Sequence, residues 1–320
     1  MRFVSEATAR SLVTIRDAID VVEGVFLALH RQQAEVFPVV LGHGSDPGSR
    51  FSMKSGLIRD QGLVGLKVGT YWPGNRSRGL ESHGSTTFFL DDATGAPRAL
   101  VSASHLTALR TAAADGVAIK HLARPGVMTL GVVGAGHQAW FDVLAAMEVR
   151  PVERLLVWSR TPANAERFAQ RACDELELDA RAGDLQAVVE AADVLLTVTA
   201  ASEPLVRRAW VRPGAHISAM GADARGKHEL DPELVGQAVL FADVVEQALS
   251  IGEYEAAFEA GLIQAGSVTP LGAVVAGVRP GRTSPEDITI FDSSGIALQD
   301  LAIGAFALAA AERAGQAVDV

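Results

Sequence analysis

The stretch Gly131-Val-Val-Gly134-Ala-Gly136-His-Gln-Ala139 determines how the rest of the chain is interpreted. It begins within the apolar run Met128–Val133, which is typical of a buried strand, and leads into a segment with helical spacing. Gly134 permits a tight turn, Gly136 lets a pyrophosphate approach the backbone, and Ala139 keeps the following helix close to the sheet. The helix N-terminus supplies free N–H groups to the phosphates. The stretch predicts a dinucleotide-binding turn, and the alternative is a plain glycine turn in a sheet protein.

Downstream of this turn, short apolar runs alternate with helix-length segments. Runs without polar alternation indicate strands that are buried on both faces, and this arrangement predicts an α/β fold with a doubly wound parallel sheet. Besides Met128–Val133, we expect strands at Arg154–Val157, Val194–Val198, His216–Met220, Val239–Val244 and Ile288–Ile290, and helices up to about Glu148 and over Ala163–Glu177.

The rest of the chain mixes helical and strand-like patterns. Apolar residues recur at three- and four-residue steps in Ile15–Leu29, and the Ala- and Leu-rich segment Ser104–Ala123 also predicts a helix. Between these segments, Leu63–Val68 and Thr86–Leu90 predict strands joined by turns. The segment Gly295–Arg313 predicts a helix whose broad apolar face must be covered by another layer or a second subunit.

Composition excludes several classes of protein. Hydrophobic residues make up 48% and charged residues 21% of 320 residues, which is typical of a folded chain of about two domains. The net charge of −10 argues against binding to nucleic acid or to an anionic membrane surface. The longest uncharged apolar stretch, Leu301–Ala311, is too short to span a bilayer.

The N-terminus and the cysteine content indicate a cytoplasmic protein. The start of the chain carries charges at Arg2, Glu6 and Arg10 and no apolar run, so we expect no signal peptide. The single cysteine, Cys173, cannot form an intramolecular disulfide and leaves no zinc framework. It lies in a predicted helix, where packing is a better explanation for it than chemistry, and we predict no metal site.

The end of the strand after the glycine turn bears on the choice of dinucleotide. NAD enzymes usually have an acidic residue there, about 20 residues after the glycines, which holds the ribose hydroxyls. This chain has Ser159-Arg160-Thr161 instead, and arginine suits the recognition of a phosphate by paired donors. These residues favour NADP(H) over NAD(H), with Asn164 as a helper. The alternative is that Arg160 is an ordinary exposed loop residue.

Several stretches, in the same order along nearly the whole chain, resemble the ornithine cyclodeaminase/mu-crystallin family. They are Gly65–Asn75, Leu109–Ala114, the glycine turn with Ser159-Arg160-Thr161, Met220–Leu230, and Phe291–Gly295 followed by Ala297–Leu301. The resemblance implies a Rossmann domain at residues 119–294. It would be inserted in an α+β domain for substrate binding and dimerisation, formed by residues 1–118 and 295–320, and the family expectation is a homodimer.

The resemblance implies that Lys67 and Arg110 hold a substrate carboxylate. Their chemistry agrees, because a small amino or imino acid needs a cation for its carboxylate, and an unpaired Lys67 within an apolar run would be costly. The alternative for Lys67 is a solvated lysine at a strand end. The family has a further arginine upstream, for which Arg50 is the candidate and His43 competes.

The resemblance also implies that Asp223 transfers a proton. It follows the predicted strand His216–Met220, and ligands bind at the carboxyl edge of such sheets. In an apolar pocket, the pKa of a carboxyl group can rise enough for it to act as an acid near neutral pH. The alternative is a turn aspartate or a helix cap before Lys227.

Further cofactor contacts are implied on both sides of the glycine turn. His83 lies where the family places a group near the nicotinamide, although a core or turn histidine is an equal interpretation. The other residues are His137, Gln138, Thr111, Thr199, Met220, Lys227 and Ser293.

Together these residues predict an NADPH-dependent reductase of cyclic imino acids, converting Δ1-pyrroline-2-carboxylate or Δ1-piperideine-2-carboxylate to L-proline or L-pipecolate. Lys67 and Arg110 would fix the carboxylate, and Asp223 would protonate the imine nitrogen while hydride adds to C2. Ornithine cyclodeaminase is an alternative, but it recycles its cofactor and has no need of NADPH, so Ser159-Arg160 favours the reductase. An alanine-type amino-acid dehydrogenase and a crystallin-type small-molecule binder are the remaining alternatives.

Overall fold

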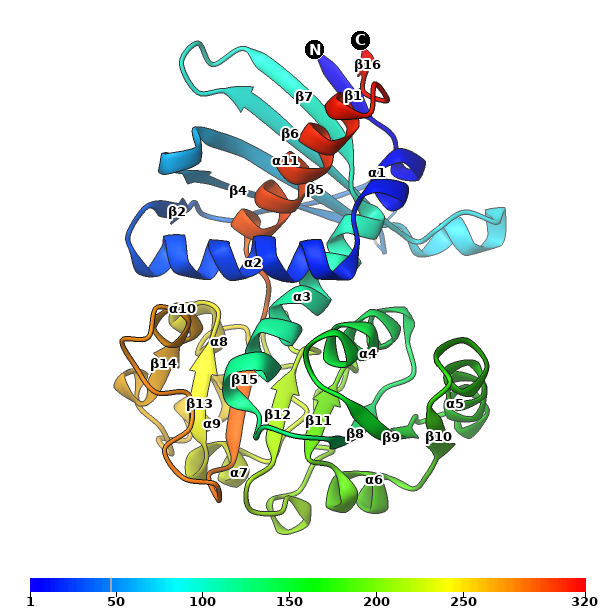
Figure 1. Ribbon diagram of the computed structural model, residues 1–320, viewed down its shortest axis with the longest axis vertical. Coiled ribbons are helices and arrows are strands. Elements are labelled where there is room, and N and C mark those ends of the chain that lie inside the picture. The colour runs from blue at the N-terminus through cyan, green and yellow to red at the C-terminus, as the bar shows by residue number, and fades with distance from the viewer. Residues whose placement is uncertain (47) are drawn as a thin grey trace. The chain divides into compact units, whose positions relative to one another are not determined.

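The computed structural model describes residues 1–46 and 48–320, apart from the side chain of Arg76, and comprises two compact units. Unit 1 consists of Met1–Thr111 and Ile296–Val320, and unit 2 of Ala112–Gly295. The chain passes from unit 1 to unit 2 within helix α3 (Ser104–Leu122). It returns just before helix α11 (Ala297–Arg313) (Figure 1).

Unit 2 is built on a parallel sheet of eight strands in the order β10–β9–β8–β11–β12–β15–β13–β14, which Figure 1 shows across the unit. The strands are β8 (Met128–Val133), β9 (Val152–Trp158), β10 (Asp179–Ala182), β11 (Val194–Thr197), β12 (His216–Ala219), β13 (Val239–Ala242), β14 (Val268–Pro270) and β15 (Thr289–Asp292). The predicted parallel sheet is confirmed. The short strands β10 and β14 were not predicted, because neither has a long apolar run.

Helices cover both faces of this sheet. Along β11, Val194 and Leu196 pack into one hydrophobic core, whereas Leu195 between them packs into the other. This explains why the strands are apolar without alternation. The helices of unit 2 after α3 are α4 (His137–Val149), α5 (Pro162–Leu176), α6 (Leu185–Ala191), α7 (Pro232–Gln237), α8 (Val245–Ala248), α9 (Glu255–Glu259) and α10 (Leu271–Val275).

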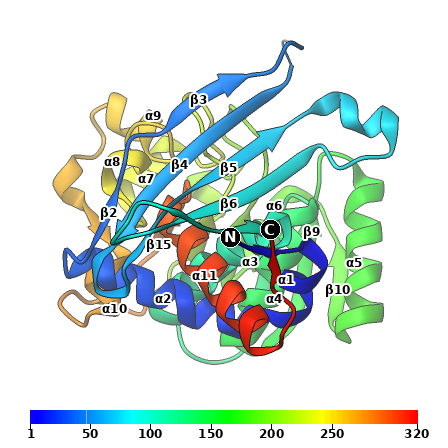
Figure 2. The same cartoon turned by 90° about the horizontal axis from the view of Figure 1, so that it is seen from above.

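Unit 1 is built on a mixed sheet in the order β16–β1–β7–β6–β5–β4–β2, with β3 also paired to β4. Its strands are β1 (Arg2–Val4), β2 (Ala34–Val36), β3 (Val40–His43), β4 (Arg50–Ile58), β5 (Leu63–Tyr71), β6 (His83–Asp91), β7 (Pro97–Ser102) and β16 (Val318–Asp319). Strands β3 to β6 run antiparallel side by side (Figure 2).

Three helices pack within unit 1. They are α1 (Glu6–Leu12), α2 (Ile15–His30) and α11. The predicted helix at Ile15–Leu29 is confirmed as α2, and it begins with a capping box formed by Thr14 and Asp17. Helix α11 contacts α1, α2, β4 and β5, so its apolar face is covered by a layer of the same unit and needs no second subunit.

Candidate active site

A buried cluster of two cations and one carboxylate lies within unit 1. Lys67 Nζ, from β5, donates to Asp300 Oδ1 over 2.8 Å, and Arg110 Nε, from α3, donates to the same oxygen over 3.0 Å. Arg110 Nη1 also donates to Gln299 Oε1 over 3.2 Å. Lys67 and Arg110 are only 7% and 8% exposed. The structure therefore brings together the two predicted carboxylate-binding cations and excludes a solvated lysine.

Glycines on the sheet allow Asp300 to reach this position. A Cβ at Gly65 would overlap the carbonyl oxygen of Phe88 and lie 3.1 Å from Leu301, and a Cβ at Gly56 would lie 2.7 Å from Leu298. Helix α11 can therefore lie directly on β4 and β5, which places the acidic side chain of Asp300, between the two leucines, against the sheet.

Burial and the neighbouring charges shift the pKa values of Asp300 and Lys67. Burial opposes ionisation of Asp300, but the charges of Arg110 and Lys67 outweigh it, so the pKa of this carboxyl lies below its usual value. Burial lowers the pKa of Lys67 to about 8, with Asp300 opposing and Arg110 reinforcing the effect. Lys67 can therefore bind an anion as an ammonium and also exchange a proton near neutral pH.

A third cation stands beside this cluster. Lys54 on β4 is the cross-strand partner of Lys67, so both side chains project from the same face of the sheet. The Lys54 side chain is half-buried, and its charge contributes to lowering the pKa of both Lys67 and Asp300. Lys54 was not among the predicted site residues.

The upstream candidates lie in a different row of the sheet. His43, Arg50, Tyr71 and His83 are successive cross-strand neighbours, with the Tyr71 and His83 ring centroids 4.8 Å apart and the Arg50 guanidinium 5.2 Å from the Tyr71 ring centre. This row is four residues along the strands from Lys67, or roughly 13 Å. The structure thus groups Arg50, His43 and His83 with one another at some distance from the buried cations.

The glycine turn of unit 2 has the backbone that a pyrophosphate needs. Gly134 has φ +115°, and a Cβ there would lie 2.5 Å from the carbonyl oxygen of Val198. Gly136 is the N-cap of α4, and a Cβ there would meet only open space. His137 begins α4, and Gln138 Nε2 donates to Asp142 Oδ1 over 2.8 Å. The residues present therefore fit a dinucleotide, whose phosphates would lie over Gly136 at the start of α4.

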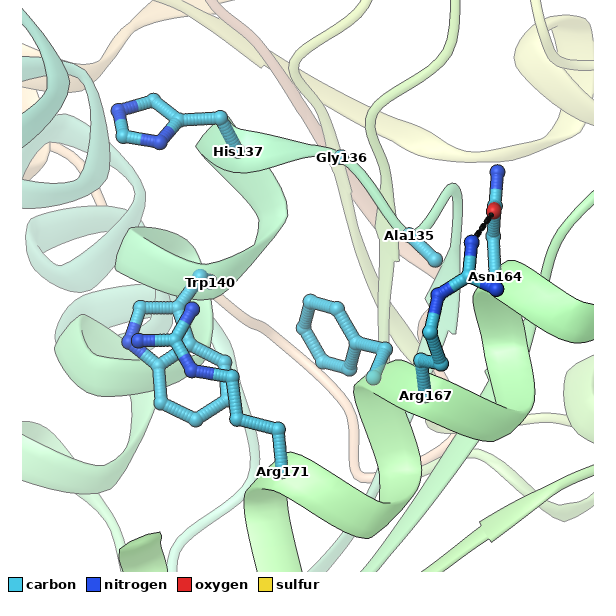
Figure 3. A pocket seen from close by; sticks show the side chains of 8 residues that line it. Ala135, Gly136, His137, Trp140, Asn164, Arg167 and Arg171 are labelled. Carbon is cyan, nitrogen blue, oxygen red and sulfur yellow. Dashed lines mark hydrogen bonds between the residues drawn. The ribbon is translucent and has the colours of Figure 1, made fainter.

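A cavity of about 350 Å³ adjoins this turn (Figure 3). Arg167 and Asn164 project from α5 beside Ala135, and Arg167 Nη2 donates to Asn164 Oδ1 over 2.5 Å. Arg171 stacks on the Trp140 ring with its guanidinium 3.6 Å from the ring centre. Two guanidinium groups next to a helix N-terminus favour an anionic ligand.

Ser159, Arg160 and Thr161 follow β9 directly, and Thr161 is the N-cap of α5. Ser159 is half-buried, whereas the Arg160 and Thr161 side chains are exposed. Residues 158–162, at the end of this strand, include no acidic residue. Thr111, on the unit 1 side of the boundary in α3, donates its hydroxyl to the carbonyl oxygen of Thr107 over 2.8 Å.

The loops after β11, β12 and β15 carry the other predicted cofactor contacts. These strands are parallel neighbours, so Thr199, Met220 and Ser293 lie along the same carboxyl edge of the sheet. Ser293 Oγ donates to Asp243 Oδ2 over 2.9 Å.

Asp223 does not lie in an apolar pocket, contrary to the expectation. Its side chain is 62% exposed and accepts a hydrogen bond from Lys227 Nζ over 2.5 Å. The carboxylate is therefore exposed and paired with an ammonium group.

Asp300 and Glu229 were not predicted as functional. An acidic residue inside the apolar stretch Leu298–Leu308 is the signal that could have identified Asp300, since a buried acid must be paired. Among the described residues, no group of three or more His, Cys, Asp or Glu side chains could hold a metal ion. None of the helices in the described ranges has the length and apolar character that a membrane crossing needs.

The whole chain matches a known family. A model described as the ornithine cyclodeaminase/mu-crystallin family covers residues 2–313. The chain belongs to this family. It is an NAD(P)H-dependent oxidoreductase, since relatives along its full length are named reductases and dehydrogenases and several solved structures contain NAD.

Three relatives show how close the likeness is. The iminosuccinate reductase of Paracoccus denitrificans is 42% identical over 320 residues, which cover 100% of this chain and 99% of that protein, and its structure with NAD+ has a TM-score of 0.96. The Δ1-pyrroline-2-carboxylate reductase of Thermococcus litoralis, solved with NADH and L-proline, is 32% identical over all of both chains with a TM-score of 0.93. An archaeal alanine dehydrogenase dimer with bound NAD is 31% identical, covers 100% of this chain and 99% of that one, and has a TM-score of 0.92.

Proposed function

We propose that this chain reduces the C=N bond of an α-imino acid and that its substrate is an acyclic dicarboxylate of the iminosuccinate type. The observation that carries the proposal is the buried pair Lys67–Arg110 on one oxygen of Asp300, with Lys54 directly across the strand. The 42% identity to an iminosuccinate reductase supports it.

The buried trio has the charge of a carboxylate-binding site. Two cations and one carboxylate leave one positive charge, which an incoming carboxylate would neutralise. Lys67 directs one proton to Asp300, and Arg110 directs Nε and Nη1 to Asp300 and Gln299. The other Lys67 protons and Arg110 Nη2 are thus the donors for the α-carboxylate of a substrate.

Lys54 is the group best placed for a second carboxylate. Cross-strand partners have Cβ atoms about 5 Å apart, which suits the two carboxylates of a four-carbon diacid. Arg50 and His43 lie in the row roughly 13 Å along the strands, too far for the same small ligand without movement of the backbone or full extension of the side chain. We therefore assign the α-carboxylate to Lys67 and Arg110 and the distal carboxylate to Lys54.

Two side chains are candidates for the group that donates a proton to the imine nitrogen. When bound, a nicotinamide supplies the hydride that adds to the imine carbon. The pKa of about 8 makes Lys67 an ammonium that can release a proton near neutral pH. Asp223, the donor expected from the sequence, is exposed and paired with Lys227, so we assign proton transfer to Lys67 and the role of a secondary donor to Asp223.

A cyclic imino acid is the second candidate substrate. Δ1-Pyrroline-2-carboxylate and Δ1-piperideine-2-carboxylate each have one carboxylate, which Lys67 and Arg110 alone can bind. The likeness to Δ1-pyrroline-2-carboxylate reductases of 32% and 35% identity favours this candidate.

For the cofactor we propose NADP(H) in preference to NAD(H). Arg160 at the end of β9, with Asn164 and Arg167 on the next helix, presents donors for a 2′-phosphate, and residues 158–162 include no acid that would repel it. The relatives solved with NAD+ and NADH make NAD(H) the alternative.

We also propose that two copies of the chain associate as a homodimer through β3. Val39, Val40 and Leu41 at this strand are 39%, 52% and 79% exposed. An exposed apolar strand is an aggregation hazard unless a partner covers it. A second copy is the occupant that we assign, because a relative with a TM-score of 0.92 was solved as a dimer.

The experiment that tests the substrate compares two imines on the purified enzyme. Iminosuccinate formed from oxaloacetate and ammonium should be reduced with a kcat/KM at least about tenfold above that of Δ1-pyrroline-2-carboxylate, because the second carboxylate pairs with Lys54. The reverse order would favour the cyclic substrate. Release of ammonia from ornithine without added reductant would show a cyclodeaminase instead.

A further inference from the structure

Buried carboxylates link the backbones of several loops at the carboxyl edge of the unit 2 sheet. Glu229 Oε1 accepts the N–H of Thr199 over 2.7 Å. Glu253 accepts the N–H groups of Glu229 and Leu230 over 2.8 and 2.6 Å, and Asp292 Oδ1 accepts the N–H of Glu253 over 3.1 Å. Each of these carboxylates thus accepts a hydrogen bond from the backbone of a different segment of the chain.

Glu229 occupies the junction between two of these loops. Thr199 lies in the loop after β11, and Gly221 follows Met220 in the loop after β12. A Cβ at Gly221 would lie 2.5 Å from Glu229 Oε2 and would overlap the carbonyl oxygen of Thr199. The carboxylate is therefore packed between the two loops, and it is completely buried.

The geometry points to Glu229 as a positioning residue that fixes the loop after β11 against the loop after β12, so that Thr199 and Met220 are held for the nicotinamide. The inference rests on the proposed cofactor contacts of these two residues. Glu229 is completely buried between the two loops, so it would act through them.

The pH dependence of cofactor binding distinguishes a positioning role of Glu229 from a purely packing role. Burial raises the pKa of Glu229 to about 7, while the hydrogen bond that it accepts from the N–H of Thr199 opposes the rise. The charged groups that face it are Glu253 and Asp292, and the charge of Glu229 helps to raise the pKa of both. Because an ionised carboxylate accepts a stronger hydrogen bond than a neutral one, protonation loosens the contact with Thr199.

The experiment measures NAD(P)H binding by nucleotide fluorescence in three full-length variants between about pH 6 and pH 8. Glu229→Ala removes the acceptor, and Glu229→Gln keeps an acceptor oxygen but cannot ionise. Glu203→Gln is the matched control, because Glu203 is an exposed acid in the same loop as Thr199. Binding rather than imine turnover is measured, so the outcome does not depend on the substrate proposal.

We expect Glu229→Ala to raise the Kd for NAD(P)H about tenfold, since a charge-assisted hydrogen bond is lost. Glu229→Gln should bind within about threefold of the wild type at pH 8 and lack the weakening that the wild type shows below pH 7. Glu203→Gln should match the wild type. Unchanged binding in Glu229→Ala, or a wild-type pH profile in Glu229→Gln, would overturn the inference. If Glu229→Ala does not fold, the profile of Glu229→Gln decides.

Discussion

At the scale of single residues, one carboxylate oxygen organises the candidate substrate site. Asp300 Oδ1 receives both Lys67 and Arg110, and the other oxygen is buried without a hydrogen-bond partner among the described residues. A buried carboxylate in this position orients the two cations and prevents their mutual repulsion from separating them. A substrate carboxylate bound there, as we propose, would meet donors that are already oriented.

Replacing Lys54 by methionine should change the substrate preference. We expect kcat/KM for the dicarboxylate to fall about 30- to 100-fold and that for Δ1-pyrroline-2-carboxylate to stay within about threefold, because only the former uses a second cation. Lys54→Arg should restore part of the loss. Equal losses with both imines would mean that Lys54 acts only through the pKa of Lys67.

The Arg160→Asp variant tests the choice of cofactor. The carboxylate would repel a 2′-phosphate and accept ribose hydroxyls, so the Kd for NADPH should rise at least about 100-fold while that for NADH stays within about threefold. Arg181→Asp, a substitution of an arginine 70% exposed on β10, should bind both cofactors as the wild type does. Equal changes in the Kd values for NADPH and NADH would show that Arg160 does not bind the 2′-phosphate.

At the scale of secondary-structure elements, α3 and α4 bring together two acids that were not predicted from the sequence. Asp115 and Asp142 are both fully buried. Burial raises the pKa of Asp115 to about 7, and burial together with the charge of Asp115 raises the pKa of Asp142 well above its usual value. The pair is therefore more stable with at least one proton.

Stability of the fold should consequently fall as pH rises. A carboxyl whose pKa is higher in the folded than in the unfolded chain stabilises the fold fully below its unfolded pKa and loses this effect as pH rises through the folded value. We expect the urea midpoint to decrease between about pH 5 and pH 8. Across this pH range, the free energy of unfolding of Asp115→Asn should fall by less than that of the wild type, and the difference should be on the order of 3 kcal/mol.

The matched control for this measurement is Asp174→Asn, which changes an exposed acid on α5. It should keep the full dependence on pH. Glu229, Glu253 and Asp292 also have raised pKa values and act in the same direction, so some dependence should persist in Asp115→Asn. A slope in Asp115→Asn that equals that of the wild type would contradict the assignment.

At the scale of the whole molecule, each unit presents one part of the chemistry. Unit 1 holds the cations that we propose for carboxylates, and unit 2 holds the glycine turn and the loops that we propose for a nicotinamide. The chain crosses between them within α3, so Arg110 of the substrate cluster and Asp115 of the buried acid pair lie on one helix.

The proposed homodimer predicts that a charged residue on the exposed strand β3 changes the oligomeric state. Leu41→Asp places a charge on the exposed strand β3 and should shift the protein from dimer to monomer in sedimentation velocity. Val278→Asp, at an apolar residue of unit 2 that is 65% exposed, should leave the dimer intact. A dimer that persists in Leu41→Asp would locate the interface elsewhere.

The sequence by itself determined the parallel sheet, the glycine turn before α4, and helices such as α2. These features follow from patterns within a few neighbouring residues: uninterrupted apolar runs, the Gly-x-Gly-x-x-Ala spacing, and apolar residues at three- and four-residue steps. The tertiary structure alone decided that Asp300 pairs with Lys67 and Arg110, that Lys54 stands beside them, and that Asp223 faces water. Those contacts join residues far apart in the chain, and they depend on strand register and on how closely α11 approaches the sheet, which no local pattern specifies.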